Sequence, residues 1–289
     1  MDLKKLLLSL AVSLPLAATG CGDDGSGPNE PGPSCGEGQE VWRLTGLTLP
    51  ASSADVIGFD LDGQNTTTAG DDKDPAEGCG VVDLEGGVDN QLGFLLSAEG
   101  ALGGILSGSL DLDLQAEIDN AINSGKLKIE AVIANYTGAG SQNVTLTLYS
   151  QGERVVNATP VTVDEAGNLS AEISRLPISL EGLQIDVLGE IKTFDVSLTI
   201  RDGRVEIPAP GASNTATAVI GGGVPYTGAG NDSFRNTLEG LVDALDLGIT
   251  LEQIEGIITP ELDLASTGSS ECNALSLGVE AAFQKQPCE

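Results

Sequence analysis

Residues 126–134, which read KLKIEAVIA, decide the fold class of this chain. Every second residue of the stretch is apolar, and the residues between are mainly charged or small. This period-two pattern is typical of a strand that buries one face and exposes the other. The same alternation returns at 144–148, 169–173, 185–187 and 194–200.

Turn-forming sequences separate these stretches. The clearest are DEAGN at 164–168 and RDGR at 201–204. The second predicts a tight hairpin that returns through Val205 and Ile207. Short strands joined by such turns form antiparallel sheets. We therefore predict a mainly β fold, either an antiparallel β-sandwich or an open barrel, with a few short packed helices.

Helical periodicity is confined to a few places. An apolar stripe along 234–245 predicts an amphipathic helix. Thr250 and Gln253 have the spacing of a capping box, which predicts a second short helix ending at Pro260. A third helix is expected over 114–122, just before a Ser-Gly pair. Apolar stripes of this kind pack against a sheet.

The N-terminus has the organisation of a secretory signal. Lys4 and Lys5 precede an uncharged, mainly apolar run at 6–18, and small residues lead from there to Cys21. The run is shorter than the ~20 residues that a membrane-spanning helix needs. We therefore predict export and cleavage.

The segment LAATGC at 16–21 resembles the lipobox of bacterial lipoproteins. In that family the cysteine thiol is acylated and the residue becomes the new N-terminus, so the resemblance implies lipid attachment at Cys21. Gly22, rather than Asp, follows it. In the family this favours the outer membrane or cell surface over the inner membrane. We expect a membrane-anchored, extracytoplasmic protein.

Three parts follow from these features. Residues 1–20 are the predicted signal peptide. Residues 21–40 are rich in Gly, Pro, Ser and acids, which predicts a flexible tether because such a stretch buries too little surface to fold. Residues 41–289 form the mainly β domain, with an acidic, loop-rich part at 55–93 and a helical part at about 231–260.

The chain has 5 cysteines, an odd number. Without Cys21 an even set remains, which suits two disulfides in an oxidising compartment. Its members are Cys35, Cys79, Cys272 and Cys288. Pairing of neighbours in the sequence, Cys272 with Cys288 and Cys35 with Cys79, closes the short loops, and the other connectivities stay open.

Composition excludes several classes of function. The formal net charge of -30 makes nucleic acid an unsuitable partner, because affinity for phosphates comes mainly from Lys and Arg. The absence of histidine removes the usual general base and imidazole zinc sites. No nucleophile elbow or phosphate-binding loop is present. We therefore predict that the protein is not an enzyme.

The acidic segment 60–90 is the best candidate for a metal site. Its carboxylates and an amide surround several glycines, and calcium takes six to eight oxygen ligands in flexible loops of this kind. The candidate ligands are Asp60, Asp62, Asp83, Glu85, Asp89 and Asn90. The plain alternative is a solvated loop, because Asp and Gly are also common turn residues.

The runs GFDLDG at 58–63 and GVDNQLG at 87–93, joined through a Gly-Cys-Gly, resemble a segment of lipid-anchored cell-surface proteins of Gram-negative bacteria. That family has no assigned activity, so the resemblance implies a location and leaves the function open.

Our main hypothesis is a non-enzymatic role in binding, adhesion or envelope structure, with calcium as a structural cofactor. The partners would be the membrane, through the anchor, and an unknown protein or apolar ligand. A second hypothesis is a carrier that shelters an apolar ligand between helices and sheet, which requires an apolar cavity. A third is a carboxylate-dependent hydrolase, which requires two acids in one cleft, one with a raised pKa.

Overall fold

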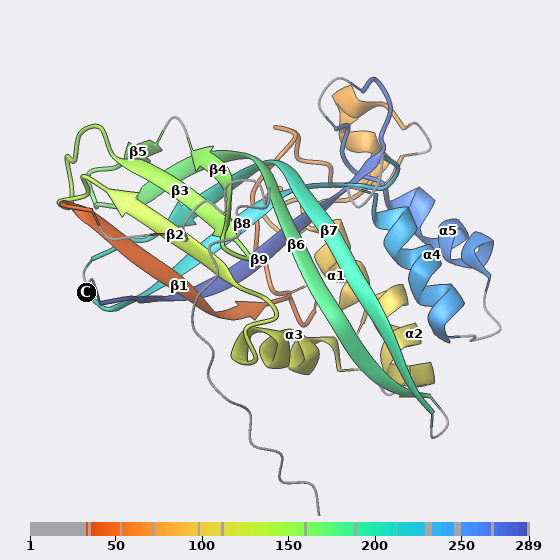
Figure 1. Cartoon of the computed structure of the whole chain (residues 1–289). Helices are drawn as coiled ribbons and strands as arrows, with labels where there is room; N and C mark the ends of the chain where they lie inside the picture. Colours follow the sequence, from red (N-terminus) through yellow and green to blue (C-terminus); the bar gives the residue numbers. More distant parts are fainter. Residues whose placement is uncertain are drawn as a thin grey trace, which may run out of the picture.

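A computed structural model describes residues 33, 36–52, 54–70, 73–97, 99–110, 113–158, 161–187, 190–211, 213–228, 233–245, 250–266 and 269–287. Its centre is one antiparallel sheet with the strand order β4-β3-β2-β1-β9-β8-β7-β6-β5, curled into a half-barrel (Figure 1). The strands are β1 (Gln39–Thr48), β2 (Ile129–Ala134), β3 (Thr145–Ser150), β4 (Glu153–Ala158), β5 (Val161–Val163), β6 (Leu169–Val187), β7 (Glu190–Ile207), β8 (Thr215–Pro225) and β9 (Ala274–Lys285). The predicted mainly β fold is confirmed, in its open-barrel form.

The curl brings strands from the two ends of the sheet together. Neighbours in the sheet are mostly neighbours in the sequence, and the β1–β9 pair in the middle of the order joins the two runs of strands. β4 lies against β6, and the Ser150 hydroxyl of β3 donates to the Pro177 carbonyl of β6 at 3.0 Å. The inward side chains of this curled sheet form one apolar core.

Helices occupy two of the connections between strands. The β1–β2 connection holds the 3-10 helix η1 (Pro75–Gly80) and helices α1 (Gln91–Leu96), α2 (Ala101–Leu110) and α3 (Leu114–Asn123). The β8–β9 connection holds α4 (Phe234–Leu245), α5 (Leu251–Ile258) and the 3-10 helix η3 (Thr259–Glu261). α4 packs on β7, α3 on β1 and α1 on β9 (Figure 1). Among the described residues, no helix has the length and apolar character needed to cross a membrane.

The three predicted helices are confirmed. The Thr250–Gln253 capping box starts α5, and the Asp113 side chain caps α3 by accepting from the Ala116 amide at 3.0 Å. α1 and α2 were not predicted, because they fall in or beside the acidic, glycine-rich part of the chain. α2 contains three glycines and a serine pair that weaken any helical signal.

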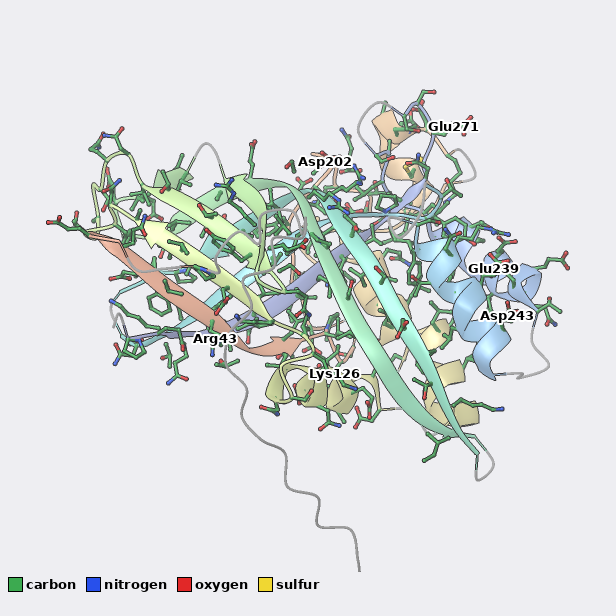
Figure 2. All side chains as sticks on the ribbon, in the orientation of Figure 1. Arg43, Lys126, Asp202, Glu239, Asp243 and Glu271 are labelled. Atoms are coloured by element: carbon green, nitrogen blue, oxygen red, sulfur yellow. A yellow bond between two sulfur atoms is a disulfide. The ribbon has the colours of Figure 1, made fainter. Side chains whose placement is uncertain are left out.

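The hairpin predicted at 201–204 is wrong. β7 runs through this segment and stays paired with β6 from Ile207 to Glu190. Asp202, with a φ of 50°, instead belongs to a β-bulge against β8. Figure 2 labels its position. Gly203 is required there for packing, because a Cβ atom on it would lie 2.3 Å from the Gly221 carbonyl oxygen.

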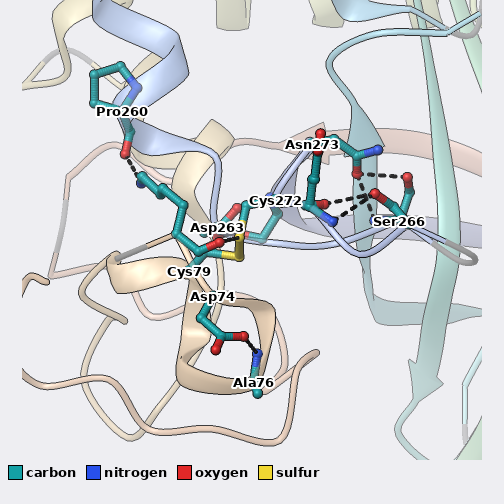
Figure 3. Close-up of a disulfide and its surroundings, with 12 residues drawn as sticks. Asp74, Ala76, Cys79, Pro260, Asp263, Ser266, Cys272 and Asn273 are labelled. Atoms are coloured by element: carbon teal, nitrogen blue, oxygen red, sulfur yellow. Dashed lines mark hydrogen bonds between the residues drawn. A yellow bond between two sulfur atoms is a disulfide. The ribbon is translucent and has the colours of Figure 1, made fainter. Parts of the chain in front are cut away.

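The acidic segment lies against β8 and β9 and is fastened by a disulfide. Cys79 of η1 is bonded to Cys272, which precedes β9 (Figure 3). Pairing of Cys79 with Cys35 is therefore wrong, and so is pairing of Cys272 with Cys288. Cys35 and Cys288 lie outside the described residues, as does Cys21.

Candidate functional site

An apolar cavity of about 110 Å³ lies between the half-barrel and its helices. The sheet side is lined by inward side chains of β1, β6, β7 and β9, and the helix side by α1, α2, α3, α4 and α5. Side chains that line it from the sheet include Ile178, Leu180, Phe194, Val196 and Leu198. Those from the helices include Leu102, Ile118, Leu238, Leu241, Val242 and Ile254.

Sequence periodicity places these side chains. Residues 194, 196 and 198 point to one face of β7 because a strand alternates its sides. Leu238, Leu241 and Val242 fall on one face of α4 because they are three and four residues apart. Thr237 is the polar residue of the lining, and its hydroxyl donates to the Ser197 carbonyl. Among the described residues, the wall therefore offers a ligand apolar contact and no charged group.

The acidic segment forms a second candidate site. Asp60, Asp62 and Asp89 bring one carboxylate oxygen each to within 4.8 Å of one another. Two stretches of chain meet here, because the Asp89 amide donates to the Phe59 carbonyl at 2.9 Å. Asp89 is buried, with 2% of its surface exposed, and its Oδ2 accepts from the Leu61 amide at 2.6 Å.

Electrostatics at this cluster favour proton or cation uptake. Burial raises the pKa of Asp89 to about 8, and the neighbouring Asp263, Asp62 and Asp83 carboxylates add to the rise. Burial also raises the pKa of Asp62 and of Asp83. Carboxylates held together in this way are neutralised either by protons or by a bound cation.

The remaining predicted ligands differ in their surroundings. Asp83 is close to Asp89, and its Oδ2 accepts from the Thr66 amide at 2.6 Å. Glu85 is exposed and stands outside the group of three. Asn90 caps α1 through the Gly93 amide and binds the backbones of Ile57 and Gly278, so its side chain is occupied.

Asp263 is a member of this region that sequence reasoning missed. It is buried between α5 and β9, and burial raises its pKa to about 7. The Ser276 amide donates to its Oδ1 at 2.7 Å, and the Ser276 hydroxyl donates to Oδ2. No local motif marks it, since the fold brings it to Asp89 from a distant part of the chain.

Asp263 and Asp62 also line a hollow of about 220 Å³ beside the disulfide. Both have a raised pKa, which the hydrolase hypothesis requires of one acid in a cleft. Both carboxylate oxygens of Asp263, however, are engaged by Ser276. That arrangement suits a structural role for Asp263 better than proton transfer to a substrate.

Comparison with known proteins provides no relative from which a function could be inferred. No family model, curated protein or solved structure matches this chain. The cavity and the acidic cluster are the features of the described residues that bear on function.

Proposed function

We propose that this chain is a non-enzymatic, lipid-anchored extracytoplasmic protein that shelters an apolar ligand between its half-barrel and its helices. The apolar cavity carries the proposal. Interiors are normally close-packed, with few voids larger than a water molecule. A void of about 110 Å³ costs roughly 2 to 3 kcal/mol at the penalty measured for cavities in cores. A bound apolar ligand would recover that free energy.

The size of the cavity fits a small ligand. An engineered apolar cavity of roughly 150 Å³ stays dry and binds benzene, and this one is of similar volume. Of the functions considered from the sequence, the carrier is the one that requires such a space. Adhesion and envelope structure do not require it.

Benzene is the probe that tests the cavity. A concentration ten times its Kd should raise the free energy of unfolding by about 1.4 kcal/mol, because it binds the folded state alone. Leu238→Trp, which fills the cavity from α4, should abolish this stabilisation. Glu239→Trp places the same side chain on the exposed part of α4 and should preserve it.

Thermal unfolding with and without benzene measures the effect. Equal stabilisation of both tryptophan variants would contradict the carrier proposal, and so would no stabilisation of the unaltered chain. If Leu238→Trp does not fold, Val242→Phe fills the same space with a smaller increase in volume.

The anchor is tested separately by intact mass. The signal organisation and the lipobox resemblance support acylation of Cys21. We expect the mature protein isolated from membranes to begin at Cys21 and to carry added acyl mass. Cys21→Ser should release it from the membrane fraction. A mature N-terminus elsewhere, or a mass without acyl groups, would contradict the anchor.

Calcium is proposed as a structural cofactor of the acidic segment. The convergence of Asp60, Asp62 and Asp89 supports it, and Asp83 is adjacent. With calcium at 100 times Kd, the folded state should gain about 2.7 kcal/mol. Asp62→Asn should remove the gain, whereas Glu165→Gln, an exposed acid in a distant turn, should leave it unchanged. Identical melting midpoints in calcium and in chelator would eliminate this proposal.

A further inference from the structure

We infer that the cavity holds a single hydrocarbon chain of an amphiphile whose head group is uncharged and stays outside the protein. This inference rests on the proposed carrier function and specifies its ligand. Three features of the described residues support it: the course of the lining along the hairpin, the lack of an available polar group inside, and the charge of the covering helices.

The long β6–β7 hairpin forms one side of the lining, beside β1 and β9 and opposite the helices. Ile178 pairs with Leu198 across the two strands, and Leu180 pairs with Val196. The inward positions from 194 to 198 on β7 cover about 13 Å at the rise of a strand. A volume of about 110 Å³ is small beside a wall of this length, so the cavity has room for a slender group only. It suits one extended chain better than a bulky ring system.

The part of the lining that the structure describes provides no group to bind a polar head. Thr237 is the polar lining residue, and its hydroxyl is already bonded to the Ser197 carbonyl. A head group drawn inside would lose its hydrogen bonds to water without replacement, at a cost of several kcal/mol for an uncharged group and more for an ion. The head therefore stays at the protein surface.

The helices around the cavity are strongly acidic. α3, α4 and α5 together carry six acids and one base, Arg235. Arg235 is paired with Glu255 at 2.6 Å and with Glu239 at 3.5 Å. Figure 2 shows Glu239 and Asp243 projecting from α4. Lys126, beside the lining residue Leu127, donates to the Gly182 carbonyl at 3.2 Å. A carboxylate or phosphate head meets net repulsion at this surface.

A chain-length series on the full mature protein tests the inference. Calorimetric titration with n-alkanols should show affinity rising about fourfold per methylene, the increment expected when each added group is buried. The rise should stop at the length that fills the cavity. Alkanoates of equal length should bind at least tenfold more weakly at low salt, and the difference should shrink at high salt.

Variants and controls separate the possible failures. Leu238→Trp should lose alkanol binding, and Glu239→Trp should retain it. Alkanoates that bind as tightly as alkanols would overturn the inference, as would an affinity independent of chain length. Benzene binding without alkanol binding would overturn the inference of a hydrocarbon-chain ligand and would leave the carrier proposal standing. Failure of both probes would overturn both.

The source of the chain is distinguished by a second arm. A monoacylglycerol, which has one chain and an uncharged head, is offered free in solution and within phosphatidylcholine vesicles. Its transfer from sedimented vesicles to the protein would support the inference and identify a membrane source. Uptake of the free molecule alone would support it and identify a soluble source. Uptake in neither arm would contradict it.

Discussion

Replacing both Cys79 and Cys272 by alanine is expected to lower the free energy of unfolding by about 4 to 5 kcal/mol. The two cysteines are 193 residues apart in the sequence. A disulfide that closes so long a loop removes a large part of the conformational freedom of the unfolded chain, and in the chain-entropy model the effect grows with the logarithm of loop length. Chemical denaturation of the oxidised protein and the variant measures the difference.

Position in the fold adds a local consequence. Cys79 lies in η1 within the acidic segment, and Cys272 lies at the entrance to β9 (Figure 3). The bond therefore fastens that segment to the sheet, and Lys73 strengthens the attachment by donating to the Pro260 carbonyl. Relative to the unaltered protein, the variant should show a larger increase in amide hydrogen exchange at residues 60–90 than in β6 or β7.

A matched control comes from the same segment. Val82→Ala alters an exposed side chain and should change stability by less than about 0.5 kcal/mol. A loss below about 1 kcal/mol in the double cysteine variant would contradict the expected role of the bond.

The pairing of cysteines shows where sequence reasoning stops. Alternating strands and helix caps are local patterns, so β2 and the start of α5 could be predicted from their own residues. Disulfide partners, by contrast, are chosen by the fold. η1 lies beside the start of β9 because of how the acidic segment packs on the sheet. No local sequence feature indicates that packing.

The bulge at Asp202 shows a different limit. RDGR has the composition of a two-residue hairpin turn, and its residues do take up a turn-like backbone, with φ of 50° at Asp202. Pairing on both sides keeps β7 continuous. The glycine that favours a turn also allows close packing of two strands, so composition alone does not separate the two outcomes.

Sequence patterns predicted part of each candidate site, but not every residue in it. Acid spacing pointed to Asp60, Asp62 and Asp89, which the fold brings together. Helical stripes beside a sheet pointed to a space for an apolar ligand. Asp263 could not be found in this way, because its proximity to Asp89 depends on how the β8–β9 connection crosses the acidic segment.

Asn90→Ala is expected to lower the free energy of unfolding by about 3 to 5 kcal/mol. The Asn90 amide group donates to the Ile57 carbonyl at 2.7 Å and to the Gly278 carbonyl at 2.9 Å. Its Oδ1 accepts from the Gly278 amide at 2.8 Å and from the Gly93 amide at 3.2 Å. One side chain thus joins the acidic segment, α1 and β9. Truncation leaves several buried backbone groups without partners, each at a cost of about 1 to 3 kcal/mol.

The contact between Asn90 and β9 also requires a glycine at position 278 of β9. The approach of the acidic segment to β9 depends on Gly278, where a Cβ atom would lie 2.3 Å from the Ile57 carbonyl oxygen. No side chain therefore fits at Gly278, and the Asn90 side chain joins the two backbones by hydrogen bonds to both. Asn214→Ala, which truncates an exposed asparagine, should change stability by less than about 0.5 kcal/mol.

Calcium dependence decides between the two roles considered for Asn90. A calcium ligand contributes stability only when the metal is bound, so its removal should cost stability in calcium and little in chelator. A residue that joins backbone segments contributes in both conditions. Because all four hydrogen bonds of the Asn90 side chain go to protein backbone, we expect the same loss with calcium and with chelator. A loss confined to calcium would assign Asn90 to the metal site instead.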